Sequence, residues 1–123
     1  MPIIRIQAIR TEHLEVAKLL VDTSGALAEA FGIEPAQCWS CFTEIRPGEY
    51  LEGARLRGEG GDSRHSPLVA VSAYEGRTAA EISKALDGVA EAVVANLGLE
   101  RGDVFVEYHE LRAGQVYTGG GVR

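Results

Sequence analysis

The chain has 123 residues, of which 46% are hydrophobic and 24% charged, and its formal net charge is −6. This length fits one compact domain, and the apolar fraction is ordinary for a globular protein. The sequence has no apolar run long enough for a membrane span and no signal-peptide pattern, and its acidic charge without a Lys/Arg cluster argues against a nucleic-acid partner. Cys38 and Cys41 diverge on a predicted strand, which favours reduced thiols and a cytoplasmic protein.

The first half of the chain predicts a strand, a helix and a second strand. Residues 3–9 are β-branched and partly alternating, which is typical of a strand. Thr11 is the expected N-cap of a helix, and Gly32 is placed to end it. Residues 38–45 alternate and predict the second strand. The apolar residues that recur at helical spacing are Leu14, Ala17, Leu20, Val21, Leu27, Ala28 and Phe31.

The second half predicts the same order of elements. Residues 67–74 form the expected opening strand, and residues 104–111 the closing one. Between them, Thr78 and Glu81 have the spacing of a capping box, which predicts the start of a helix that ends at Gly98. The apolar stripe of this helix consists of Ile82, Ala85, Leu86, Val89, Val93 and Leu97.

The two halves are copies of one unit. An offset of about 66 residues aligns 31–34 with 97–100 and 44–48 with 110–114, and it places Trp39 on Phe105. We therefore expect a single domain over 1–123, made of two β-α-β units (about 2–54 and 67–120). A polar, Gly-rich connector over residues 53–66 joins them.

The repeat predicts an α+β fold with a four-stranded mixed sheet and two helices on one face. A β-α-β crossover makes the two strands of each unit parallel. The other face of the sheet stays partly apolar, and a single layer cannot cover it. We therefore expect an oligomer.

Pro2 is the residue that is best suited to act in acid–base catalysis. A small second residue normally permits removal of Met1, which would leave a proline with a free secondary amine. An α-amino group titrates at about 8, and burial or a nearby cation lowers that value, so the amine can act as a general base near neutral pH. The alternative is that Pro2 only begins a strand, where its missing N–H does no harm.

The repeat and Pro2 together resemble the tautomerase superfamily. The second half resembles 4-oxalocrotonate tautomerase (4-OT) in Pro67, in the turn at residues 75–78, in Glu110-Leu111 and in the closing segment 114–120. The two-unit length is similar to macrophage migration inhibitory factor, malonate semialdehyde decarboxylase and cis-3-chloroacrylic acid dehalogenase. The resemblance implies a homotrimer that uses an N-terminal proline without a cofactor.

The resemblance assigns roles residue by residue. Pro2 matches the catalytic proline, whereas Pro67 is internal and has no amine, which implies one site per chain and three per trimer. Arg77 matches the arginine that binds the substrate carboxylate. The expected substrate-binding residues are an aromatic group and the residue that replaces the family's hairpin phenylalanine: Trp39, Tyr74, Phe105, Tyr117 and Val116.

Several positions depart from the family pattern. Trp39 and Phe105 stand where 4-OT has its second arginine, and Tyr74 stands at an additional arginine of the dehalogenases. Thr118 replaces the dehalogenases' water-activating glutamate. Glu52 occupies the equivalent place in the first copy, whose hairpin should face Pro67.

The matching and departing residues together predict a keto–enol tautomerase that acts on a 2-keto carboxylic acid with an apolar or aromatic side chain. Decarboxylation, or hydration and dehalogenation of a small acid, is the alternative on the same scaffold. A catalytically silent trimer that binds a small carboxylate or a protein partner is another. No metal site is expected, because His13, His65 and His109 show no ligand spacing.

Overall fold

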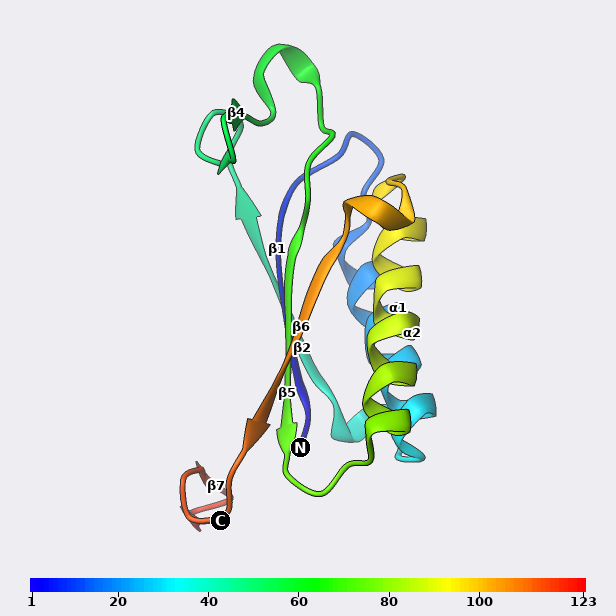
Figure 1. The fold of residues 1–123 in the computed structure, drawn as a ribbon, viewed down its shortest axis with the longest axis vertical. Helices are drawn as coiled ribbons and strands as arrows, with labels where there is room; N and C mark the ends of the chain where they lie inside the picture. Colours follow the sequence, from blue (N-terminus) through cyan, green and yellow to red (C-terminus); the bar gives the residue numbers. More distant parts are fainter.

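The computed structural model describes all 123 residues as a sheet with both helices on one face (Figure 1). The strands of the sheet are β1 (Ile3–Ile9), β2 (Trp39–Ile45), β5 (Leu68–Tyr74) and β6 (Phe105–Leu111), in the order β2-β1-β5-β6. β1 is parallel to β2 and β5 to β6, whereas β1 and β5 are antiparallel. This confirms the predicted mixed sheet.

The core lies between the sheet and the helices α1 (Val16–Phe31) and α2 (Ala79–Leu97). Because side chains alternate along a strand, Ile4 and Ile6 of β1 are fully buried toward the helices, whereas Arg5 between them is exposed on the open face. Val71 of β5 and Val89 of α2 are fully buried in the same cluster. The open face has no second layer in the chain.

The helix ends follow the sequence signals with one exception. Thr78 and Glu81 form the predicted capping box of α2, and Gly98 and Gly32 adopt the left-handed conformation that ends each helix. The predicted N-cap at Thr11 was wrong. Its carbonyl accepts a hydrogen bond from the Leu14 N–H in a separate turn, so α1 begins only at Val16.

The buried stripe of α1 differs from the predicted one. Val21 has 69% of its surface exposed, whereas Thr23 is fully buried. Thr23 can be buried because its hydroxyl donates a hydrogen bond to the Leu19 carbonyl oxygen at 2.9 Å. The predicted helical period was correct. However, Thr23 occupies a buried position, because its hydroxyl finds a hydrogen-bond partner within the helix.

Two short hairpins extend from opposite ends of the sheet (Figure 1). β3 (Leu51–Glu52) pairs with β4 (Arg55–Leu56), and β7 (Tyr117–Thr118) pairs with β8 (Gly121–Val122). The expected connector from residue 53 therefore begins inside the first hairpin. Three short 3-10 turns complete the chain at Pro35–Gln37, Glu59–Gly61 and Arg101–Asp103. No helix has the combination of length and apolar character needed to cross a membrane.

Candidate active site

A small apolar hollow of about 160 Å³ lies at the amino end of β1. Pro2 is buried between two of the residues that line it, Met1 and Ile3. The remaining wall comes from the start of β2, the ends of β5 and β6, and the second hairpin. Those lining residues are Trp39, Tyr74, Leu111, Val116, Tyr117 and Thr118.

The strand register explains why these distant residues meet. Ile3 lies opposite Trp39 in the parallel ladder with β2 and opposite Ser72 in the antiparallel ladder with β5. Tyr74 is two residues beyond Ser72 on the same face of its strand, so it lies at the amino end of β1. The Trp39 N–H also donates a hydrogen bond to the Pro2 carbonyl oxygen at 3.0 Å, which holds Pro2 against the start of β2, beside the hollow.

Four of the five expected substrate-binding residues share this hollow, and Phe105 does not. Trp39, Tyr74, Val116 and Tyr117 line it, together with Ile3 and Leu111, which the sequence reasoning missed. Phe105 lies opposite Leu68 at the far end of the sheet, where 52% of its surface is exposed. The repeat equates Trp39 and Phe105, but antiparallel pairing of β1 with β5 places them at opposite ends. Within one chain, Phe105 therefore lies apart from the other four, and its role in substrate binding stays a prediction.

Arg77 also lies outside the hollow. Its guanidinium donates a hydrogen bond to the Phe31 carbonyl oxygen at 2.9 Å, at the end of α1, and stacks 4.3 Å from the centre of the Phe31 ring. It also forms an ion pair with Glu81 at 3.2 Å. Hydrogen bonds from Thr78, and then the one from Arg77, hold the pKa of the Glu81 carboxyl below its usual value. In this state Arg77 joins the end of α1 to the start of α2.

The equivalent position in the second copy is closed by the connector. The Phe105 N–H donates to the Pro67 carbonyl oxygen at 3.4 Å, as Trp39 does to Pro2. Ser66, which precedes Pro67, donates its N–H to Glu52 at 2.7 Å and accepts a hydrogen bond from the Tyr50 hydroxyl at 2.7 Å. The first hairpin thus faces an enclosed peptide bond rather than an amine.

Glu52 is a carboxylate in this enclosed region. Burial opposes its ionisation, but hydrogen bonds from Arg57 and Ser66 outweigh that effect and keep its pKa below the usual value. Each carboxylate oxygen of Glu52 accepts a hydrogen bond, one from Arg57 and one from Ser66, so the side chain binds the connector in place.

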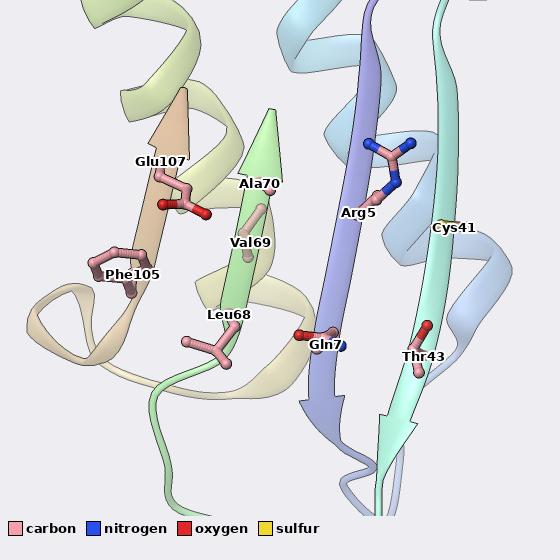
Figure 2. A pocket seen from close by; sticks show the side chains of 9 residues that line it. All are labelled: Arg5, Gln7, Cys41, Thr43, Leu68, Val69, Ala70, Phe105 and Glu107. Carbon is pink, nitrogen blue, oxygen red and sulfur yellow. The ribbon is translucent and has the colours of Figure 1, made fainter. Parts of the chain in front are cut away.

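A different hollow of about 300 Å³ lies on the open face of the sheet (Figure 2). Figure 2 shows Arg5 on β1 and Glu107 on β6, with β5 between them. Phe105 belongs to this hollow, whereas Pro2 does not line it. The other lining residues are Gln7, Cys41, Thr43, Leu68, Val69 and Ala70. The alternation of side chains along each strand is a sequence signal that predicts the polar residues of this hollow on the open face. No group of three or more His, Cys, Asp or Glu side chains is arranged to hold a metal ion.

Comparison with solved structures finds the same fold over nearly the whole chain. The fused 4-OT F6, solved as a wild-type asymmetric trimer, superposes with a TM-score of 0.85 at 16% identity over 98% of this chain and 94% of that chain. Pt0534, solved after inactivation by 2-oxo-3-pentynoate, gives 0.83 at 20% identity over 98% and 94%. Macrophage migration inhibitory factor of Toxoplasma gondii gives 0.76 at 16% identity over 98% and 99%. No protein-family model and no curated protein matches the sequence.

Proposed function

Because the chain has the fold of the tautomerase superfamily, we propose that it is a cofactor-independent keto–enol tautomerase of a 2-keto carboxylic acid. In this proposal Met1 is removed and the amine of Pro2 carries the proton. The observation that supports it most directly is the position of Pro2, which is buried beside an apolar hollow under Met1.

The surroundings of Pro2 suit proton transfer. A neutral amine is a base, and apolar surroundings favour the neutral over the charged form. We expect Pro2 to take the proton from the 2-hydroxyl of the enol and to return a proton to the neighbouring carbon of the same molecule. The reaction is an isomerisation, so it neither gains nor loses a proton and needs no redox partner.

The hollow contains no cation, so the substrate carboxylate needs a partner from outside it. We propose Arg77 for this role. The arginine follows Tyr74 by three residues, and it would exchange the Phe31 carbonyl and Glu81 for the substrate carboxylate. Arginine suits this task because its planar guanidinium can bind both carboxylate oxygens.

We also propose that the chain works as a homotrimer. F6 fused 4-OT was solved as a trimer with the same fold. Both hairpins of this chain have strands of only two residues, and Leu51, Leu56, Tyr117 and Val122 on them are between 51% and 74% exposed. Isolated two-stranded hairpins are marginally stable, so packing against neighbouring chains would account for their order.

The first test is the intact mass combined with chemical labelling. We expect the purified protein to lack Met1 and to be labelled on Pro2 by 2-oxo-3-pentynoate, because a neutral secondary amine adds to an alkyne conjugated with a ketone. Pro2→Ala should lower kcat/KM for ketonisation of phenylenolpyruvate or 2-hydroxymuconate by at least about 100-fold. Pro35→Ala, which changes an exposed proline, is the control. Full activity of Pro2→Ala, or of protein that retains Met1, would refute the role of the amine.

The same assay tests Arg77. Arg77→Ala should mainly raise KM for carboxylate substrates, and Arg77→Lys should restore less than half of the loss, since lysine cannot bind both oxygens. If Arg77→Ala lowers the melting temperature but changes neither kcat nor KM, the arginine only joins the two helices.

A further inference from the structure

The second hairpin, which we define as residues 112–123, is tied to the rest of the chain by a single hydrogen bond. Inside the hairpin, Gly114 N–H donates to the Arg123 carbonyl at 2.8 Å and Arg123 N–H to the Val116 carbonyl at 2.7 Å. The only bond that leaves it runs from the Ala113 N–H to a carboxylate oxygen of Glu75, at 2.8 Å.

Glu75 is linked to three elements that line the apolar hollow beside Pro2. It directly follows Tyr74, and its own N–H donates to the Leu111 carbonyl oxygen at 3.1 Å. Its carboxylate holds the start of the second hairpin, which carries Val116, Tyr117 and Thr118 into the hollow. Glu75, which directly follows β5, therefore bonds both to the end of β6 and to the start of the hairpin.

The first copy has no counterpart of this bond. The strand registers pair Ile3 with Trp39 and Leu68 with Phe105, so Leu68 corresponds to Ile3. Counted from there, Arg10 occupies the position of Glu75, and it forms an ion pair with Glu44 at 2.7 Å. Pro47 occupies the position of Ala113 and has no N–H to donate. The first hairpin is held through Ser66 instead, by Tyr50 and Glu52. The Glu75 bond is thus found only at the hairpin that lines the hollow beside Pro2.

We propose that Glu75 is a positioning residue that sets the second hairpin over Pro2. Its carboxylate does not line the hollow, so it acts through the hairpin and not on the substrate. Loss of the bond should leave the amine unchanged but let Val116 and Tyr117 move away from the bound molecule. The predicted effect falls on substrate binding, and this part of the inference rests on the proposed function.

The test removes the bond from each side in the full-length protein. Glu75→Ala removes the acceptor, and Ala113→Pro removes the donor with the residue that the first copy has at that position. We expect each variant to raise KM, and to weaken phenylpyruvate binding measured by the fluorescence of Trp39, by roughly fivefold to tenfold. kcat should change less than twofold. The double variant should have a KM no higher, and phenylpyruvate binding no weaker, than the single variant that binds less tightly, because both changes remove the same bond.

The matched control is Arg10→Ala, at the same repeat position by the other hairpin, which should leave KM and phenylpyruvate binding within twofold. Hydrogen exchange of residues 112–123 provides a readout without substrate, and it should quicken in both single variants while the helices stay protected. Additive effects, unchanged exchange, or the same rise in KM for Arg10→Ala would overturn the role of Glu75. If the wild-type protein isomerises no substrate but hydrogen exchange of residues 112–123 is still faster in both single variants, the proposed function fails. The role of Glu75 in holding the second hairpin is then supported.

Discussion

At the residue scale, His65 shows how the connector is fixed. The side chain is buried, its Nε2 accepts the Ile9 N–H at 2.9 Å, and its Nδ1 donates to the Ser63 carbonyl oxygen at 2.6 Å. Since Ile9 can only donate, Nε2 must be unprotonated, and the ring is neutral. Burial lowers the pKa of His65, although the hydrogen bond to Ser63 opposes that effect.

The neutral ring predicts a pH-dependent stability. The unfolded chain takes up a proton at about pH 6.5, whereas the folded chain resists it, so the unfolded state binds more protons in the window below that pH. The free energy of unfolding should therefore be highest above about pH 7 and should decline toward pH 5.5, by at most about 1.4 kcal/mol per pH unit. Urea unfolding at several pH values measures this.

Two variants separate His65 from the other histidines. His65→Gln should flatten the decline between pH 7 and 5.5. His13→Gln, which changes a side chain that is 91% exposed, should leave it as it is. An equal decline in His65→Gln would show that another group titrates.

At the element scale, Gly88 of α2 packs closely against Ala26 of α1. A Cβ added there would lie 3.3 Å from the Ala26 Cβ of α1, whereas one added at Gly25, also inside a helix, would meet nothing within 4 Å. The two glycines therefore have different effects on the structure. Gly88 permits close packing, and Gly25 only costs backbone entropy.

This difference predicts opposite effects on stability. Gly88→Val should lower the free energy of unfolding by about 1–3 kcal/mol, because the extra atoms push α1 and α2 apart. Gly25→Ala should raise it by up to about 1 kcal/mol, because alanine favours the helix and has room. Thermal and urea unfolding measure both. Stabilisation by Gly88→Val would show that the helices are not in close contact there.

Local signals made most elements predictable from the sequence. The capping box at Thr78 and the glycines at 32 and 98 act through neighbouring residues, so their structural effect can be predicted along the chain. The position of Phe105 could not be predicted in this way, because the repeat shows which residues are equivalent but not that β1 and β5 run antiparallel. The bond from Ala113 to Glu75 joins residues 38 apart and left no local pattern.

Arg77 shows the same limit at the candidate site. The resemblance supplied a role for the side chain. Its partner Glu81 is only four residues ahead, but its contact with Phe31 depends on how the end of α1 meets the start of α2. That meeting is a property of tertiary packing, which residue spacing does not carry.

At the scale of the whole molecule, exposed apolar side chains on both hairpins indicate an incomplete surface. Leu51 and Leu56 lie opposite each other on the first hairpin and are 62% and 51% exposed. A leucine that becomes buried contributes about 2 kcal/mol, and three chains would each bury such a pair.

Leu56→Glu should therefore shift the protein from the proposed trimer toward monomers, since a carboxylate in an apolar contact is strongly unfavourable. Light scattering after size-exclusion chromatography measures the mass. Lys84→Glu, an exposed charge reversal on α2 without an ion pair, should leave the trimer intact. A monomeric wild-type protein, or a trimeric Leu56→Glu, would count against this interface.

Both ends of the chain lie at the end of the sheet that holds the second hairpin (Figure 1). This placement affects how the protein should be produced. A purification tag before Met1 would keep the Pro2 nitrogen in a peptide bond, and a tag on Arg123 would extend from the second hairpin, which lines the hollow beside Pro2. The exposed turn at Glu59–Gly61, near the other hairpin, is the better insertion point for a tag or fluorophore. A negative assay on a terminally tagged preparation would therefore report an effect of the tag and would not test the proposed function.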